Sequence, residues 1–153
     1  MGYKPNVVVI NCGTNDAQRT IDPGGAGERM RNVLQDIWGG ANMEKTCIML
    51  STVLPTTNVA GSTNRITINR LYRTLVEQYW KAGKCIYLAE MDPEGSGNGW
   101  ISLNSDMDPD GIHPNDQGHR KMAGVFYKVC LYNYILISTA NLRSLSLRLS
   151  MRI

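Results

Sequence analysis

Three short apolar runs, separated by helix-like segments, constrain the fold of this chain more than any other feature. The runs are Val7 to Ile10, Thr46 to Leu54 and Cys85 to Ala89, and turn residues or a proline follow them. Continuous apolar runs of this length are typical of strands buried on both faces. Strands that alternate with helices pair in parallel through right-handed crossovers. We therefore expect a three-layer α/β/α sandwich with a parallel sheet.

The segments between these runs have the periodicity of helices that pack one face on a sheet. The first carries an apolar stripe at helical spacing and stops at Gly39 and Gly40; its members are Met30, Val33, Leu34, Ile37 and Trp38. A second helix is expected from about Asn64, with Gly83 as its C-cap. A third is capped by Asn115 or Asp116. Three strands are few for a sheet covered on both faces, which indicates that part of the domain is missing.

Charge and hydropathy exclude several classes of function. The chain has 153 residues with 16 Lys and Arg against 13 Asp and Glu, and the excess comes from Arg143, Arg148 and Arg152. Residues 1–130 are therefore neutral, which argues against a nucleic-acid partner. No apolar run approaches the roughly 18 residues of a membrane span. Residues 1–5 do not form a signal peptide, and localisation stays open.

The four cysteines and the last residues give weaker signals. The cysteines are far apart with no C-x-x-C pair, so we expect buried free thiols and leave disulfides open. Residues 131–153 form an atypical tail in which Leu and Ser or Arg alternate from Ser144 onward. That alternation is typical of a strand, or the tail has no selected structure, which is the interpretation we favour.

Two polar segments carry the candidate chemistry. The first is Gly13-Thr14-Asn15-Asp16 after the first run, and the second is Asp110-Gly111-Ile112-His113 before the last helix. A neutral imidazole is a suitable general base for a hydroxyl nucleophile near neutral pH. Asp110, three residues before His113, can accept the other ring N–H and orient the ring. Asn15, at the end of a strand, can donate its amide N–H to an oxyanion.

Together these segments resemble the SGNH (GDSL-type) hydrolase family, whose third block is Gly-x-Asn-Asp and whose fifth block is Asp-x-x-His. The stretch from Asp110 to Ala123 is most similar to the carbohydrate-esterase branch, and the resemblance covers about residues 5–129. It implies a flavodoxin-like α/β/α sandwich and hydrolysis of an acylated small molecule or polysaccharide, with no metal or organic cofactor.

The resemblance also assigns the site residues. It implies that Asp110 and His113 are the catalytic pair and that Asn15 lies in the oxyanion hole. Gly13 and Asp16 are supporting residues, and Asp16 is expected to hold its own turn.

One block of the family is missing from the sequence. The nucleophile of the family is a serine in a Gly-Asp-Ser block, and the 153 residues contain no such block. Ser51, inside a predicted strand, and Ser96, in a glycine-rich loop, are poor substitutes. We therefore expect residues 1–130 to be the C-terminal portion of an SGNH domain that is inactive by itself.

An alternative is a non-catalytic carbohydrate-binding protein that uses Trp100. This residue can stack on a sugar or can cover the sheet as a hydrophobic plug. Two further motifs are expected to be incidental. Asp106 to Gly111 imitates the start of a calcium loop but has Gln117 where a bidentate Glu is required. Gly24 to Gly27 lacks the spacing of a phosphate loop and is predicted to be a mobile loop.

Overall fold

The computed structural model describes the backbone of residues 4–92 and 100–150, and the side chains of these residues as far as Asn133. Within it, three parallel strands form one sheet in the order β1-β2-β3. Their bounds are β1 Val7–Ile10, β2 Cys47–Ser51 and β3 Ile86–Ala89. Val8 pairs with Ile48, and Ile48 pairs with Ile86. The parallel order follows from the helices that connect each strand to the next.

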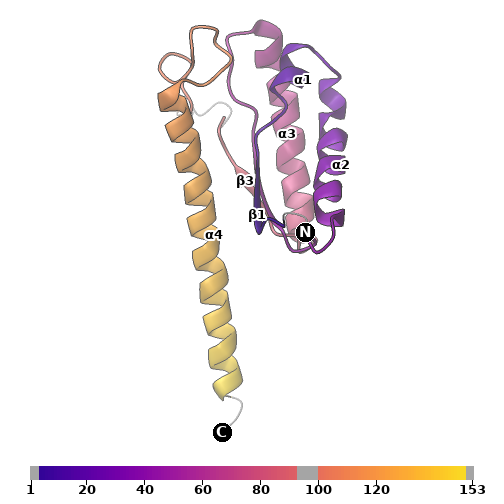
Figure 1. Cartoon of the computed structure of the whole chain (residues 1–153), viewed down its shortest axis with the longest axis vertical. Helices are drawn as coiled ribbons and strands as arrows, with labels where there is room; N and C mark the ends of the chain where they lie inside the picture. The colour runs from indigo at the N-terminus through magenta and orange to yellow at the C-terminus, as the bar shows by residue number, and fades with distance from the viewer. Residues whose placement is uncertain (1–3, 93–99, 151–153) are drawn as a thin grey trace.

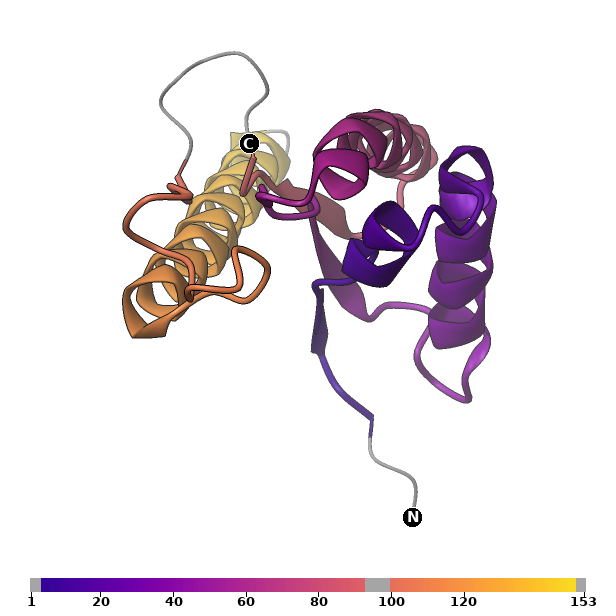
Figure 2. The same cartoon turned by 90° about the horizontal axis from the view of Figure 1, so that it is seen from above.

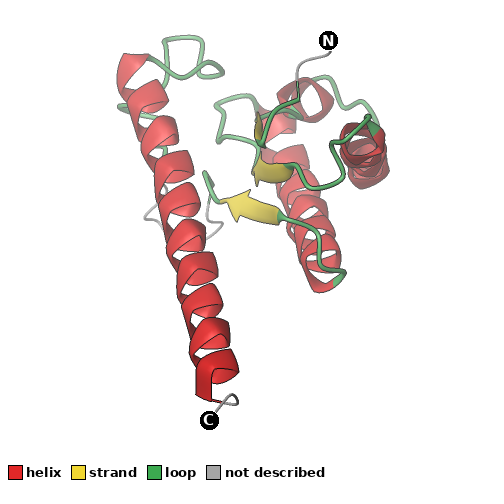
Figure 3. Ribbon diagram, turned by 60° about the horizontal axis from the view of Figure 1, so that its bottom comes forward, coloured by secondary structure: helices red, strands yellow, loops and turns green. Residues whose placement is uncertain are grey.

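Helices cover both faces of this sheet, which confirms the predicted three-layer sandwich. One layer contains α1 Thr14–Gln18, the 3-10 turn η1 Pro23–Gly25, α2 Ala26–Gly39 and α3 Val59–Lys81. The other contains α4, Asp116–Ser150. Figures 1 and 2 show α4 on one side of the sheet and the other helices opposite, and Figure 3 shows the strands between them. None of the described helices is long and apolar enough to cross a membrane.

Two apolar clusters lie on the two faces. The larger is between the sheet and α2 and α3, and its fully buried members include Leu34, Ile48, Leu50, Ile68 and Ile86. The smaller lies toward α4 and contains Leu54, Ala89, Met91, Ile101, Met107 and Val125. Burial of such side chains stabilises the fold by about 1.5–3 kcal/mol each relative to exposure. The apolar stripes of the sequence therefore face the sheet, except at Val33 of the first stripe, which is 43% exposed.

The prediction that β1 is buried on both faces is wrong. Val7 and Val9 are 43% and 51% exposed, whereas Val8 and Ile10 face the larger cluster side and are half-buried. β1 is an edge strand, and α4 packs against β3 rather than β1. A run of β-branched residues does not reveal which of its faces a helix will cover.

Some element bounds also differ from the prediction. α3 begins at Val59 rather than near Asn64, because the Asn58 side chain accepts a hydrogen bond of 2.7 Å from the Gly61 N–H and caps the helix earlier. The second strand ends at Ser51 rather than Leu54. Gly83 follows the last turn of α3 with φ of +81°, as a glycine after a helix often does.

The glycine-rich segment Gly24 to Gly27 is part of η1 and the start of α2, not a separate loop. The Gly25 N–H donates to Asp22, and the Arg29 guanidinium donates to the backbone oxygens of Ile21 and Asp22. The prediction of a loop is therefore wrong, because this segment belongs to two helical elements.

The strand interpretation of the alternating tail is also wrong, because α4 continues through Ser150. A strand satisfies its backbone groups only beside another strand, whereas a helix satisfies them within itself. A segment that continues an existing helix can therefore remain helical whatever the alternation of its side chains. The division of the chain into residues 1–130 and a separate tail, residues 131–153, is a proposal.

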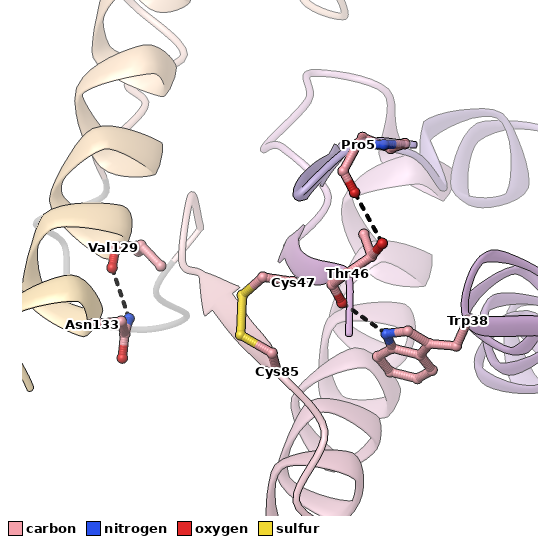
Figure 4. The surroundings of a disulfide bond; sticks show 7 residues. All are labelled: Pro5, Trp38, Thr46, Cys47, Cys85, Val129 and Asn133. Carbon is pink, nitrogen blue, oxygen red and sulfur yellow. Dashed lines mark hydrogen bonds between the residues drawn. A yellow bond between two sulfur atoms is a disulfide. The ribbon is translucent and has the colours of Figure 1, made fainter. Parts of the chain in front are cut away.

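Cys47 and Cys85 form a disulfide, with 4.6 Å between their Cα atoms (Figure 4). Sequence analysis left this possibility open and favoured free thiols. The parallel register brings the two residues together, because Ile48 pairs with Ile86 and the Ile48 N–H donates to the Cys85 carbonyl. The pairing therefore depends on strand register, which cysteine spacing does not encode.

Candidate active site

Asp110 and His113 lie on the loop before α4 and contact each other directly. The Asp110 Oδ2 is 2.6 Å from the His113 Nδ1, and Oδ1 accepts the backbone N–H groups of Ile112 and His113 at 2.8 and 3.0 Å. A carboxylate can only accept, so Nδ1 carries the proton in this contact. The second ring nitrogen, Nε2, is then the basic one.

The two side chains change each other's proton affinity. The hydrogen bond from His113, followed by the backbone N–H donors, lowers the pKa of Asp110 to about 2. The hydrogen bond and the negative charge of Asp110 raise the pKa of His113 above its usual value. Asp110 therefore stabilises the imidazolium that a general base becomes after it takes a proton.

His113 and Asn15 line the same cavity, of about 390 Å³, together with Thr14, Ile112 and Pro114. Asn15 lies in α1, directly after the carboxyl end of β1. Within the described part of the chain, the Asn15 side chain makes no hydrogen bond, so its amide N–H is available to a ligand. The structure thus brings together an imidazole and an amide donor that are far apart in sequence.

Gly13 makes the turn that places Asn15. Its φ is +109°, and a Cβ at this position would lie 2.8 Å from the Val53 side chain and 3.0 Å from the Tyr72 hydroxyl. Only glycine fits without displacing the core. Asp16 then fastens α1 to the start of α2, because its carboxylate accepts two hydrogen bonds from Arg29, at 2.7 and 3.1 Å. Asp16 therefore binds the neighbouring helix rather than its own turn.

The His113 loop is attached to the segment after β2 by contacts that sequence reasoning missed. The Gly111 carbonyl accepts from the Thr56 hydroxyl at 2.9 Å and from the Thr57 N–H at 3.1 Å. Gly111 has φ of +65°, and a Cβ there would overlap the Thr57 side chain. The sequence shows two consecutive threonines after Pro55, which could have indicated hydrogen-bond donors at this position. Nothing in the neighbouring residues identifies the Gly111 carbonyl as their acceptor.

Asn115 joins the same loop to α4 and is the cap that the sequence predicts. Its side-chain oxygen accepts from the N–H groups of Gln117 and Gly118, each at 3.0 Å. Its amide nitrogen donates to the carbonyls of Ser105 and Met107. One side chain thus holds the helix start and the loop before it, which limits the positions that His113 can adopt.

Asp106 belongs to this support and not to a calcium loop. It is fully buried and accepts from Lys121 at 2.6 Å, from the Ser102 N–H and from the Ser105 hydroxyl. Burial raises the pKa of Asp106, but these hydrogen bonds outweigh it and the net shift is downward. In the described residues, no group of three or more His, Cys, Asp or Glu side chains is arranged to hold a metal ion.

Replacing Gly118 by alanine is expected to destabilise the protein by about 1–3 kcal/mol, the usual cost of overpacking. A Cβ at Gly118 would overlap the backbone carbonyl of Asp106. Urea or thermal unfolding measures the change. Gly124→Ala is the matched control on the same helix, because a Cβ at Gly124 meets nothing within 4 Å. It is expected to be neutral or stabilising, and equal losses in both variants would contradict the steric argument.

Other residues considered from sequence lie elsewhere. Trp100 is 48% exposed and lies against α4, with the Lys128 ammonium 4.6 Å from its ring centre; it does not line the cavity of His113. Ser51 is buried, and its hydroxyl oxygen accepts from Asn11 at 2.6 Å. Ser96 lies outside the described residues.

Comparisons with known proteins agree with this architecture. A family model described as GDSL-like lipase/acylhydrolase matches residues 1–121. Among solved structures, a Clostridium thermocellum family 3 carbohydrate esterase is similar with a TM-score of 0.67 and 20% identity, over 87% of this chain and 59% of that one. A Streptococcus pneumoniae protein described as a candidate platelet activating factor follows with a TM-score of 0.61 and 16% identity, over 80% and 58%.

Identities this low show a shared fold only, and the chain spans less than two thirds of each of these structures. No curated protein matches the sequence. The family match covers most of the chain, and the two solved structures share its fold.

Proposed function

Because this chain belongs to the GDSL-like lipase/acylhydrolase family, we propose that it carries the base, the orienting acid and an oxyanion donor of an esterase for acetylated carbohydrates. One observation carries the proposal: the 2.6 Å contact between Asp110 and His113, beside a cavity that Asn15 also lines. Membership of the family supports ester hydrolysis as the reaction class. The substrate and the roles of individual residues are the proposed part.

In the proposed reaction, a serine hydroxyl attacks the ester carbonyl while the His113 Nε2 takes its proton. Asp110 is a positioning residue, which holds the ring and stabilises its positive charge. The Asn15 amide N–H donates to the oxyanion of the tetrahedral intermediate. His113 then gives its proton to the leaving alcohol, and water hydrolyses the acyl-enzyme by the reverse sequence of proton transfers.

The nucleophile in this scheme is the serine of a Gly-Asp-Ser block, which the 153 residues do not contain. The chain therefore supplies the acid–base part of the site and depends on a serine from outside these residues. The carbohydrate substrate is supported by the similarity to a solved carbohydrate esterase and by the His-Pro-Asn-Asp-x-Gly sequence that begins at His113.

Asp110→Asn tests the central pair. The substitution removes the negative charge beside His113, so the pKa of His113 is expected to fall toward its ordinary value of about 6.5. A pH titration of the His113 imidazole proton resonances by NMR, in the original chain and in the variant, measures the pKa. An unchanged pKa of His113 would show that the two side chains are not coupled and would remove the basis of the mechanism.

The same shifts predict how stability depends on pH. The pKa of His113 is raised on folding, so its contribution is complete below about pH 6.5 and is lost as pH rises through the folded value. Asp110 has a lowered pKa, so its contribution is present above the ordinary carboxyl pKa of 3.8 and is lost as pH falls through about 2. In Asp110→Asn, the free energy of unfolding, measured by urea denaturation at several pH values, is expected to depend less on pH in both ranges.

A carbohydrate-binding protein without catalysis is the second candidate, and Trp100 favours it. Trp100 lines a groove of about 400 Å³ against α4, with Lys121, Gly124, Val125 and Lys128. Saturable binding to acetylated xylan fragments is expected to be lost in Trp100→Ala and retained in His113→Ala under this hypothesis. The opposite pattern, with His113→Ala impaired and Trp100→Ala normal, would favour the esterase.

A further inference from the structure

Three of the four cysteines lie around one groove, away from the candidate active site. Cys47 and Cys85, which form the disulfide, and Cys130, which is free and exposed, line a groove of about 180 Å³ between the sheet and α4. Figure 4 shows the disulfide on the side of the sheet toward α4, opposite Val129 and Asn133. A free thiol thus shares a groove with an existing disulfide.

The alternation of the strands places both sulfur atoms on this side. Cys47 and Met49 in β2, and Cys85 and Tyr87 next to and in β3, line the groove together with Val7. Cys130 and Asn133 are three positions apart on α4 and therefore lie on one helix face. The Asn133 amide donates to the Val129 carbonyl at 2.7 Å. Among the residues that line the groove, the disulfide and the Cys130 thiol are the two partners that thiol–disulfide exchange requires.

We propose that Cys130, Cys47 and Cys85 form an intramolecular thiol–disulfide exchange site. The Cys130 thiol loses its proton to solvent, and the thiolate attacks the Sγ atom of Cys47 or Cys85. The bond between Cys47 and Cys85 breaks as the new S–S bond forms, and the displaced sulfur leaves as a thiolate that takes up a proton. The number of disulfides is unchanged, so the step requires no oxidant and no reductant.

Exchange moves the covalent link from within the sheet to between the sheet and α4. A disulfide holds its two Cα atoms about 4.4–6.8 Å apart, so the exchanged form fastens α4 to β2 or to the end of β3. α4 begins at Asp116, directly after the loop that carries His113. Exchange would therefore change which strand is covalently bonded to α4, the helix that follows the His113 loop. This consequence does not depend on the reaction that His113 performs.

Cys12, the other free cysteine, provides a control within the same chain. It follows β1 and does not line the groove. Cys12 is exposed, like Cys130, but it lies outside the groove, so it is expected not to exchange with the disulfide.

Peptide mapping under non-reducing conditions tests the proposal. The full chain is incubated at pH 8 without reductant, quenched with acid, alkylated and digested with trypsin, which separates the four cysteines because Arg19, Lys45, Lys84 and Lys128 lie around them. We expect cross-linked peptides that join Cys130 to Cys47 or Cys85, at least about tenfold more abundant than any that contain Cys12. In Cys130→Ser, alkylation of Cys47 and Cys85 is expected to fall to background, and Cys12→Ser is expected to match the original chain.

Three results would overturn the proposal. Cross-links with Cys130 that are no more abundant than those with Cys12 would show that the groove does not favour exchange. Equal alkylation of Cys47 and Cys85 with and without Cys130 would assign their release to another thiol. Exchange that falls on tenfold dilution would be intermolecular, since an intramolecular ratio does not depend on protein concentration.

Discussion

The 153-residue chain by itself is expected to hydrolyse p-nitrophenyl acetate about a millionfold more slowly than an intact serine triad, the scale of loss when the serine of such a triad is removed. His113 can accept a proton, and Asn15 can stabilise an oxyanion, but neither forms the acyl-enzyme. The members of a triad act as a unit, so the base and its acid retain little catalysis without the nucleophile. Release of p-nitrophenolate, measured against buffer, checks this.

Two comparisons make that result informative. His113→Ala is expected to leave the low rate of the chain unchanged, because the proton acceptor has no nucleophile to serve. In a longer chain with a Gly-Asp-Ser strand joined ahead of residue 1, the same variant is expected to lose activity, and Asn15→Ala to lose about 100- to 1,000-fold in kcat. Rapid hydrolysis by the 153 residues that disappears in His113→Ala would instead require a nucleophile within them and would contradict the proposed division of the site.

Removal of the disulfide is the second large effect. The bond closes a sequence separation of 38 residues, for which the chain-entropy model gives about 4 kcal/mol of stability. The double substitution of Cys47 and Cys85 by alanine is therefore expected to lower the free energy of unfolding by about 2–4 kcal/mol, because the unfolded chain regains freedom that the bond removed. Urea denaturation without reductant measures the change.

The original chain in its reduced form distinguishes the effect of losing the disulfide bond from the effect of losing the two cysteine side chains. If the bond carries the stability, the original chain in dithiothreitol is expected to unfold at nearly the same urea concentration as the double-alanine chain. A reduced chain that keeps the stability of the oxidised one would refute the assignment, and the loss in the variant would then reflect packing in the groove.

Local features of the site could be predicted because they are encoded over a few residues. Asp110 and His113 are three positions apart on one loop, and Gly111 between them permits the positive φ of its turn. The cap at Asn115 likewise requires only the next three residues. Interactions over so short a separation depend little on the rest of the fold.

The contacts that support this site could not be predicted from sequence in the same way. Thr56 and Thr57 bind the Gly111 carbonyl, and Lys121 neutralises Asp106, which the sequence suggested only as part of a calcium-like loop. A threonine hydroxyl or a lysine ammonium has many potential hydrogen-bond or ion-pair partners, and the neighbouring sequence favours none of them. Packing of the complete chain selects one of them, and the sequence pattern alone does not.

By itself, the sequence determined the order of strands and helices and the parallel sheet, because apolar periodicity specifies them. The pairing of Asp110 with His113 required only one short loop, and the resemblance of two short motifs indicated the family. Only the tertiary structure decided that Val7 and Val9 stay exposed, that Cys47 bonds to Cys85, and that Cys130 shares their groove. Each of these outcomes depends on which face a distant helix covers and on the register of neighbouring strands. Both are set by the summed packing of segments far apart in the chain, and no local pattern contains that information.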